Sequence, residues 1–416
     1  MSAPSAAAVA APASRLGLRE NLGQFSLLLV INAFVGAMVG MERSILPLLA
    51  EHEFGIASRA SILSFLLTFG IVKAFANAFA GGAADRWGRR RMLIAGWIAA
   101  LPVPLLIIFA PSWSWVVAAN VLLGVNQGLC WSAAIIMKVD LVGPRQRGLA
   151  IGLNESSGYL AVSAAALASG YLAARFSLRP EPFLLGLGAA VLGLLCSLLV
   201  RDTRGHAALE SGTDDGRSRS RPSPRAVFSR VTWTDRSLRA VSQAGLVNNL
   251  NDGVSWGLFP LFFAAHGATL ERTALLVALY PAVWGVGQLF TGPLSDRLGR
   301  KPLMTGGMVL QGLALVATGA GRSTTVWSAA MVCLGLGTAL VYPTFLGAVS
   351  DHSQPSWRAS AIGVYRFWRD LGYAFGAVLA GSAADRFGIP VSIELVGAAT
   401  ILSGLVVAAS YTERTA

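Results

Sequence analysis

Long apolar stretches alternate with short polar loops along almost the whole chain. A helix needs about 20 consecutive, mainly apolar residues to cross the hydrocarbon core of a bilayer. Six such stretches precede the polar segment 201–239 and six follow it: 26–50, 59–82, 92–110, 114–139, 149–174, 183–200, 240–265, 272–294, 303–320, 326–349, 359–384 and 390–411. The pattern predicts an all-α integral membrane protein with twelve transmembrane helices and both chain ends on the same side.

The two groups of stretches share a sequence repeat. The decapeptide GGAADRWGRR at 81–90 returns as GPLSDRLGRK at 292–301, an offset of 211 residues. The same offset joins further pairs: Asp140 and Asp351, Arg147 and Arg358, Gly152 and Gly363, and Gly170 and Gly381. A register held this long indicates a duplicated membrane unit. It predicts two pseudo-symmetric six-helix bundles around a central cavity.

Composition divides the chain into four parts. Residues 1–24 are rich in Ala, Ser and Pro and are expected to form a disordered cytoplasmic tail. Residues 25–200 make the N-terminal bundle and residues 240–412 the C-terminal bundle. The polar, arginine-rich segment 201–239 favours a mobile cytoplasmic linker between them.

The charge and composition of the chain favour a membrane protein over a soluble one. Hydrophobic residues make up 54% of the chain and charged residues only 13%, whereas soluble proteins carry about 25% charged residues. The net charge of +12 does not indicate nucleic-acid binding, because the arginines lie in short loops between apolar stretches. Those loops are expected on the cytoplasmic side. The sequence therefore predicts a multi-pass protein of the inner or plasma membrane with cytoplasmic N- and C-termini, surrounded by the lipid bilayer and functional as a monomer.

Motifs for catalysis and for cofactors are missing from the sequence. It contains no phosphate-binding Gly-Lys-Ser/Thr loop, no His/Cys cluster and no nucleophile motif. This argues against ATP-driven transport, a metal site, an organic cofactor and an enzyme. Cys130, Cys196 and Cys333 lie within apolar stretches and are expected to be small core residues. We therefore expect a small-molecule substrate as the partner, without cofactors.

The two loops with the repeated decapeptide resemble the signature loop of the major facilitator superfamily, Gly-x-x-x-Asp-Arg-x-Gly-Arg-Arg/Lys. The resemblance implies the twelve-helix fold of that family and a cycle in which two bundles rock about a central site. It also implies a cytoplasmic latch, in which we expect Arg86 to pair with Asp140 and Asp85 to accept hydrogen bonds from a facing helix N-terminus. The alternative is that these arginines only set the topology. The predicted gating residues are Asp85, Arg86, Arg89, Asp140, Arg147, Asp296, Arg297, Arg300, Asp351 and Arg358.

Ionisable residues occur inside the apolar stretches, where each costs about 2.5–3.5 kcal/mol on insertion scales. They are Lys73, Glu155, Asp252, Arg366, Arg369 and Asp370. The repeat makes Glu155 and Arg366 equivalent, so a carboxylate and a guanidinium are predicted on opposite walls of the cavity at similar depth. We expect them to contact the substrate or to form a switchable ion pair. A permanent bridge that sets helix packing is the alternative.

Polar residues beside these charges complete the predicted substrate cavity. Asn248 and Asp252 share a helix face through their i, i+4 spacing, as do Asn251 and Ser255. Trp256 is a candidate for stacking on a ligand, with plain packing as the alternative. The other cavity candidates are Asn32, Gln127, Asn154 and Tyr342. Near the outer end of the first stretch, Glu42 and Arg43 indicate either an external gate or an interface pair.

These features favour a secondary transporter that moves a small polar or charged organic solute by rocker-switch alternating access. Glu155, Asp252 and Asp370 are candidate proton carriers, and proton coupling is left open. Proton-driven efflux of drug-like organic compounds is one alternative. It is disfavoured because Gly124 replaces an arginine typical of such exporters and their Gly-Pro-x-x-Gly-Gly pattern is missing. A non-transporting membrane sensor or scaffold of the same fold is the alternative from a different class.

Overall fold

The computed structural model describes residues 16–143, 146–211, 222–354 and 357–413, and all regular secondary structure within these residues is helical. The first half of the chain forms α1 (Leu22–Arg43) with α2 (Leu46–His52), α3 (Arg59–Ile62) with α4 (Ser64–Trp87), α5 (Arg89–Ala100) with α6 (Pro102–Ile108), α7 (Trp113–Asn126) with the π-helical turn η1 (Gln127–Trp131) and α8 (Ser132–Val142), α9 (Arg147–Arg175) and α10 (Glu181–Leu199). All six stretches predicted in this half are therefore helical.

The second half repeats the same order. It forms α13 (Arg236–Gly257) with α14 (Phe259–Ala265), α15 (Leu270–Leu298), α16 (Arg300–Ala320), α17 (Thr324–Asp351), α18 (Arg358–Phe387) and α19 (Ile389–Ser410). The segments between the halves are α11 (Arg204–Ser211), α12 (Pro224–Ser229) and the π-helical turn η3 (Arg230–Thr234). The predicted all-α architecture is confirmed.

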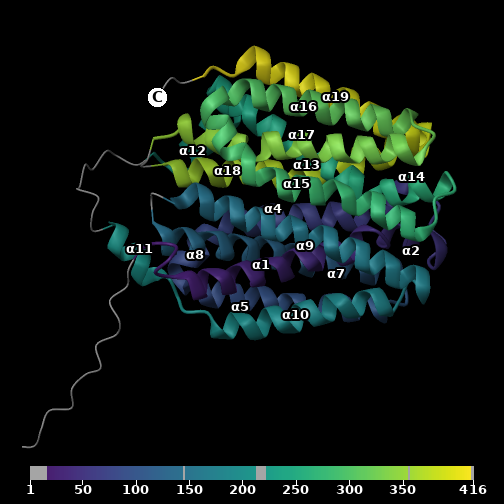
Figure 1. Cartoon of the computed structure of the whole chain (residues 1–416), viewed down its shortest axis with the longest axis horizontal. Helices are drawn as coiled ribbons and strands as arrows, with labels where there is room; N and C mark the ends of the chain where they lie inside the picture. The colour runs from purple at the N-terminus through teal and green to yellow at the C-terminus, as the bar shows by residue number, and fades with distance from the viewer. Residues whose placement is uncertain (1–15, 144–145, 212–221, 355–356, 414–416) are drawn as a thin grey trace, which may run out of the picture.

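The helices run side by side in two layers, one from each half of the chain (Figure 1). One end of the layers holds α11 and α12, and α5 and α16 begin there with Arg89 and Arg300. We call this end the arginine-loop side. The opposite end holds α2 and α14, and we call it the far side.

Prolines explain three of the breaks between helices. Pro47, Pro102 and Pro260 stand in the first two positions of α2, α6 and α14. A proline has no N–H to donate, and it is tolerated in the first turn because no intrahelical acceptor exists there. The chain therefore restarts its helix at these points without losing a hydrogen bond in a helix interior.

Glycines allow helices of one bundle to pack backbone to backbone. A Cβ atom at Gly36 of α1 would lie only 2.1 Å from the Gly158 carbonyl oxygen of α9. In the second half, a Cβ at Gly312 of α16 would lie 2.6 Å from the Gly397 carbonyl oxygen of α19. Such close approach is typical of membrane helices. Between the bundles, the main packing pairs are α9 with α15 and α4 with α18.

Two of the twelve segments are less apolar than the others. Nine helical stretches within the described residues are long and apolar enough to cross a membrane, and Ser64–Ala80 of α4 is a shorter apolar helix. The segments α13–α14 and α18 fall outside both groups. They carry Asp252, Arg369 and Asp370, which are at most 3% exposed. Their low hydropathy thus comes from charged side chains that face the protein interior and, in α13, also from buried asparagines such as Asn248 and Asn251.

Two segments expected to be disordered are partly structured. Gly17 N donates to Leu141 O at 2.9 Å, and α1 already begins at Leu22, so the expectation is wrong for the last residues of 1–24. In the 201–239 linker, Val227 and Val231 are buried against the second bundle, so this part is not a free tether. Residues 1–15 and 212–221 lie outside the described residues. There, the tail and linker stay predictions, as do the four domain boundaries.

Candidate substrate site and gating contacts

A buried ion pair joins the two bundles. Arg43, the last residue of α1, bonds to Asp252 of α13, and both side chains are 1% exposed. Arg43 Nη2 also donates to Ser255 Oγ at 2.8 Å, and its guanidinium carbon lies 6.0 Å from the ring centroid of Trp256. The choice between an external gate and an interface pair stays open, because a contact between the bundles fits both. The partner of Arg43 is not Glu42, whose buried carboxylate lies beside Asn120 of its own bundle.

Asp370 organises a second buried cluster between the bundles. Arg369 Nη2 donates to Asp370 Oδ1 at 2.7 Å, and Lys73 Nζ of α4 lies 4.0 Å from the same oxygen. Asn77, also on α4, donates to the other oxygen of Asp370. Arg369 Nη1 donates to the Tyr342 hydroxyl at 2.5 Å. Four of the predicted site residues therefore meet here.

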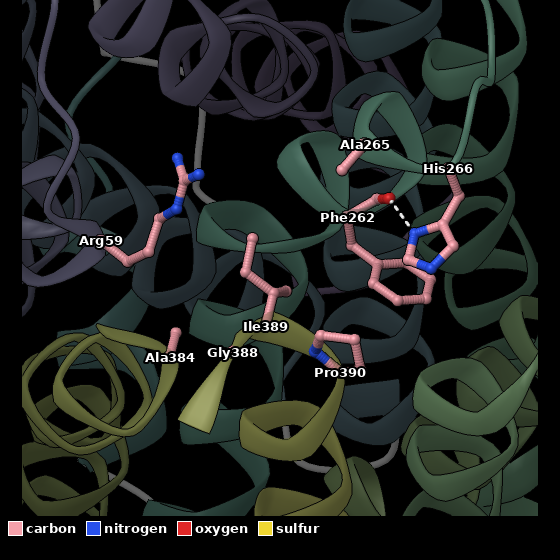
Figure 2. A pocket seen from close by; sticks show the side chains of 8 residues that line it. All are labelled: Arg59, Phe262, Ala265, His266, Ala384, Gly388, Ile389 and Pro390. Atoms are coloured by element: carbon pink, nitrogen blue, oxygen red, sulfur yellow. Dashed lines mark hydrogen bonds between the residues drawn. The ribbon is translucent and has the colours of Figure 1, made fainter. Parts of the chain in front are cut away.

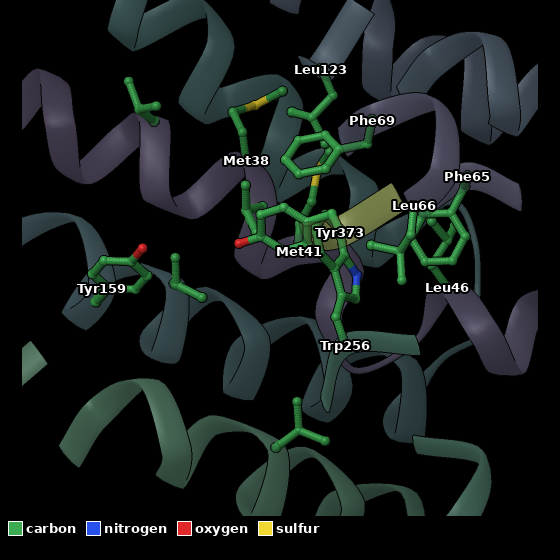
Figure 3. Packing of buried hydrophobic residues seen from close by; sticks show 14 of the residues in the cluster. Met38, Met41, Leu46, Phe65, Leu66, Phe69, Leu123, Tyr159, Trp256 and Tyr373 are labelled. Carbon is green, nitrogen blue, oxygen red and sulfur yellow. The ribbon is translucent and has the colours of Figure 1, made fainter. Parts of the chain in front are cut away.

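Tyr373 connects the two clusters. Its hydroxyl donates to Asp252 Oδ2, and its ring centroid lies 5.1 Å from Lys73 Nζ. Figure 3 shows Tyr373 and Trp256 from the second half among aromatic side chains of α4 such as Phe69. The Phe69 centroid lies 5.1 Å from that of Trp256 and 5.3 Å from that of Tyr373, both edge to face. These apolar surroundings strengthen the ion pairs by excluding water.

Glu155 and Arg366 do not pair with each other. Glu155 is 2% exposed, and its Oε1 accepts from Trp131 Nε1 at 2.8 Å and from Asn154 Nδ2 at 3.0 Å. Within the described part of the chain, its Oε2 has no partner, and neither does the Nε of half-buried Arg366. A permanent bridge between the two is therefore wrong, and a switchable pair is not formed in this state. Their contact with substrate stays a prediction.

Several residues that were predicted to line the cavity lie inside a bundle instead. Asn32 donates to Asn154 O at 2.7 Å and Gln127 to Val35 O at 2.8 Å, both within the first bundle. Asn248 is fully buried, and its two side-chain polar atoms have no hydrogen-bond partner in the regions that the structure describes.

Asn251 points away from the bundle interface. Its Nδ2 donates to Gln311 Oε1 at 3.1 Å and its Oδ1 accepts from Thr400 at 2.8 Å, so its placement in the cavity is wrong. Ser255, one turn along the same helix, contacts Asp252 and Arg43 instead. The helical spacing was compatible with either face, and only packing against α16 and α19 decides it. Trp256 packs among the aromatic side chains described above, which is the alternative to stacking on a ligand.

The signature loops pair through a different arginine from the one expected. Arg89 Nε contacts Asp140 Oδ2 at 2.9 Å, whereas Arg86 is exposed. Gly88 explains the choice: its φ of 93° favours glycine and ends α4, so Arg89 starts α5, which packs on α8. The Arg86–Asp140 pair is therefore a wrong prediction.

The second loop repeats this arrangement. Arg300, equivalent to Arg89, contacts Asp351 at 3.1 Å and Asp296 at 2.8 Å. The other gating candidates are placed differently: Arg147 and Arg297 are exposed, and Arg358 Nη2 lies 3.5 Å from Ser353 O. The Asp85 side chain lies outside the described residues, so its expected helix contact stays a prediction.

Replacing Arg89 with alanine should destabilise the protein more than replacing Arg86. The Arg89–Asp140 pair is only 11% exposed on each side, so its loss leaves a carboxylate in poor contact with water and costs about 1–3 kcal/mol. Arg86→Ala, at an exposed position, should stay within about 0.5 kcal/mol of wild type. Thermal unfolding of both variants in detergent checks this, and equal midpoints would contradict it.

Two carboxylates missed by the sequence prediction cap the helices after the signature loops. Asp202 accepts from Arg90 N at 3.3 Å, and Glu413 accepts from Lys301 N at 2.6 Å. Burial opposes ionisation of Asp202, but hydrogen bonds from Arg204 and Arg90 outweigh it and lower its pKa. A negative charge also suits a helix N-terminus. The repeat register, which makes Asp202 equivalent to Glu413, was the available signal.

A further carboxylate joins the bundles on the far side. Asp385, near the end of α18, accepts from Ser58 Oγ at 2.8 Å, Arg59 N at 2.5 Å and Ala60 N at 3.1 Å, so it caps α3 of the other bundle. The sequence held a signal for this contact as well. Residues 383–388, AADRFG, nearly repeat AADRWG of the first signature loop.

The bundles are closed on the far side and apart on the arginine-loop side. Gly170 and Gly152 lie eighteen residues apart on α9, which is five turns, so they share one face about 27 Å apart. A Cβ at Gly170 would lie 2.2 Å from Ala274 Cβ of α15, whereas one at Gly152 meets no described atom within 4 Å. The equivalent residues on α18 behave alike: a Cβ at Gly381 would lie 2.8 Å from Ala60 Cα of α3, whereas one at Gly363 meets no described atom within 4 Å.

Two hollows of about 290 Å³ each lie on the far side along the seam between the bundles. Figure 2 shows one, with Arg59 of the first half facing Phe262, His266 and Ile389 of the second. No predicted substrate-site residue lines either hollow. The central charges instead pack against each other in the interface.

Known structures share this architecture. A POT family transporter in complex with 5-aminolevulinic acid superposes with a TM-score of 0.73 at 13% identity, covering 92% of this chain and 94% of that one. The nucleoside transporter NupG superposes with a TM-score of 0.72 at 12% identity, covering 94% of this chain and 100% of that one. These similarities concern the fold alone.

Curated relatives are distant in sequence. The multidrug resistance protein MdtG of Dickeya zeae is 24% identical over 382 residues, 89% of each chain. The inner membrane transport protein YnfM of Escherichia coli is 28% identical over 154 residues, 36% of each chain.

The family model described as Major Facilitator Superfamily matches residues 27–248 and again 241–416. It therefore recognises each half of the duplicated chain, in agreement with the repeated signature loops and the two packed bundles. The chain is a multi-pass membrane protein and not an enzyme, and its family implies a small-molecule substrate. It belongs to the Major Facilitator Superfamily of secondary transporters.

Proposed function

We propose that this chain moves a small polar or charged organic solute across the inner or plasma membrane by rocker-switch alternating access. The observation that carries the proposal is the set of buried charges shared between bundles, Arg43 with Asp252 and Lys73 with Asp370. Buried ion pairs are weak sources of stability because desolvation offsets their attraction. Groups that pair across the interface in one state are free to bind a charged solute in another.

The uneven closure of α9 and α18 supports the rocking motion. Gly170 and Gly381 are pressed against the other bundle, while Gly152 and Gly363 on the same faces are not. An alternating-access cycle needs one side closed while the other opens. With the arginine-rich loops in the cytoplasm, both termini are cytoplasmic and the present state opens toward the cytoplasm. One chain holds both bundles, so a monomer suffices.

Proton coupling and proton-driven export are more specific possibilities within the transport function. Glu155, Asp252 and Asp370 are the candidate proton carriers, because their protonation depends on burial and on their cationic partners. Proton-driven efflux of drug-like compounds is a second candidate function, favoured by the similarity to MdtG over 89% of the chain. The mixed charges of the interface favour a polar solute over a lipophilic one.

Flux through the full-length protein in liposomes tests the proposal. Vesicles are loaded in turn with amino acids, nucleosides, organic anions or the lipophilic cation tetraphenylphosphonium, and counterflow of the labelled solute is measured. We expect saturable exchange of one polar class and none in protein-free vesicles. Exchange of tetraphenylphosphonium alone, driven by a pH gradient, would replace the proposal with the efflux function. Binding without flux for every class would leave a sensor or scaffold.

A further inference from the structure

Among the central charges, Glu155 and Arg366 each keep a polar atom without a partner in the described part of the protein. Arg43 also has an Nε without a described partner, but its charge is paired with Asp252, and Arg369 and Lys73 surround Asp370. Glu155 Oε2 and Arg366 Nε are buried, and no described residue forms a hydrogen bond with either atom. A buried polar group left unsatisfied costs about 1–3 kcal/mol. These two positions, equivalent in the repeat but opposite in charge, are therefore suited to a ligand with both charges.

Aromatic rings from both bundles surround the Glu155 end. Trp131 donates to Glu155 Oε1 at 2.8 Å, and its ring lies 5.4 Å from that of Tyr159, one turn along α9 from Glu155. Trp284 of α15 stacks on Tyr159 with centroids 3.5 Å apart, and Tyr342 of α17 lies 5.8 Å from Trp284. Ring faces beside a carboxylate form a favourable site for an ammonium group.

Other charged residues lie near each end of this region. On the first bundle, the Lys138 ammonium lies within electrostatic range of Glu155, but it donates to Leu28 O at 2.9 Å. On the second bundle, Arg366 shares the carboxylate of Asp370 with Arg369 and Lys73, which lie closer to it, so three cations face one described carboxylate. An uncompensated guanidinium is suited to bind a carboxylate in a bidentate geometry.

Tyr342 lies between the two ends. Both Glu155 and Arg366 act electrostatically on its hydroxyl, which also accepts a hydrogen bond from Arg369 Nη1 at 2.5 Å. The carboxylate, the rings and the guanidinium thus belong to one continuous region that spans the bundle interface.

We propose that Glu155 and Arg366 are the two poles of a binding site for a zwitterionic organic solute with an aromatic or apolar body. The amine of the solute binds Glu155 Oε2 against the rings of Trp131, Tyr159 and Trp284, and its carboxylate binds the guanidinium of Arg366. The solute then links the bundles in place of the direct stack of Tyr159 on Trp284. This inference rests on the proposed transport function, since it names the substrate class of that same interface.

Three probes with one aromatic body but different charges test the site. They are phenylalanine as the zwitterion, phenethylamine as the cation and 3-phenylpropionate as the anion. The thermal unfolding midpoint of the full-length protein in detergent is titrated with each, because a ligand of the native state raises it. For wild type we expect phenylalanine to bind roughly tenfold or more tightly than either other probe, as each lost charge removes a charged hydrogen bond.

Matched variants assign the two poles. Glu155→Gln should remove the advantage of phenylalanine over 3-phenylpropionate, and Arg366→Gln its advantage over phenethylamine. Glu42→Gln is the control, because Glu42 is an equally buried carboxyl of the same bundle. Its polar neighbour is Asn120 of its own bundle, outside the aromatic group. This control should keep the wild-type order of the probes.

The wild-type comparison decides the proposal even if a variant fails to fold. Equal binding of phenylalanine and phenethylamine would overturn it in favour of a cation site, and equal binding of phenylalanine and 3-phenylpropionate in favour of an anion site. No shift with phenylalanine, in a protein that transports another solute in liposomes, would reject the zwitterion site but keep transport. A shift with phenylalanine but no flux would keep the site and reject transport.

Discussion

Asp252→Asn is expected to abolish transport and to lower the free energy of unfolding by about 3–5 kcal/mol, the cost of leaving one member of a buried ion pair unpaired. Its partner Arg43 is 1% exposed and reaches Asp252 from the opposite bundle. With the carboxylate gone, the guanidinium keeps only neutral acceptors, namely Ser255 Oγ and the amide oxygen of the new side chain. Chemical unfolding in detergent and counterflow in liposomes measure the two effects.

The double variant separates stability from transport. Arg43→Met combined with Asp252→Asn removes both charges and should regain most of the lost stability, since no buried charge is left unpaired. Transport should not return, because the switchable contact is gone. Glu51→Gln is the matched control: it breaks the Arg59–Glu51 pair, which is 23% and 36% exposed, and should cost less than about 1 kcal/mol. Wild-type flux in Asp252→Asn would contradict the role of the pair.

Valine at Gly170 or Gly381 should open the far side. An added Cβ would lie 2.2 Å from Ala274 at the first position and 2.8 Å from Ala60 at the second, and overpacking of this kind costs about 1–3 kcal/mol. Because the clash exists only while the far side is closed, the population should shift by roughly 5–150-fold toward the far-side-open state. Distances between spin labels at His52 and Arg322, both exposed on the far side, measure the shift.

Valine at Gly152 or Gly363 is the matched control, and it should shift the population of states in the opposite direction. Both glycines lie on the same helix faces as Gly170 and Gly381, but their Cβ positions are open in this structure. They should meet the other bundle only when the arginine-loop side closes. Valine there should therefore hold the present state and shorten the mean far-side distance. The same response from all four variants would contradict the rocking of these two helices.

Much of the fold could be predicted because its signals are local or periodic. Apolar length marks all twelve membrane segments, and the 211-residue register pairs those of the two halves, although Asp252, Arg369 and Asp370 lower the hydropathy of α13 and α18. The site was less predictable: Asn77, Trp131 and Tyr373 look like ordinary residues of apolar helices until their contacts with Asp370, Glu155 and Asp252 are seen.

The sequence by itself determined that this is a duplicated, all-helical membrane protein with charges inside its helices. Helix length, the arginine-rich loops and the repeat can be found along the sequence alone. The length of an apolar stretch and the position of arginines directly determine how the chain is placed in a bilayer. Only the tertiary structure decided which charge meets which. Arg43 and Asp252 are 209 residues apart, and Asp140 binds Arg89 because a positive-φ glycine redirects the chain. Such choices depend on the rotation of each helix about its own axis and on the tilt of one bundle against the other. Spacing within a single helix does not specify either quantity.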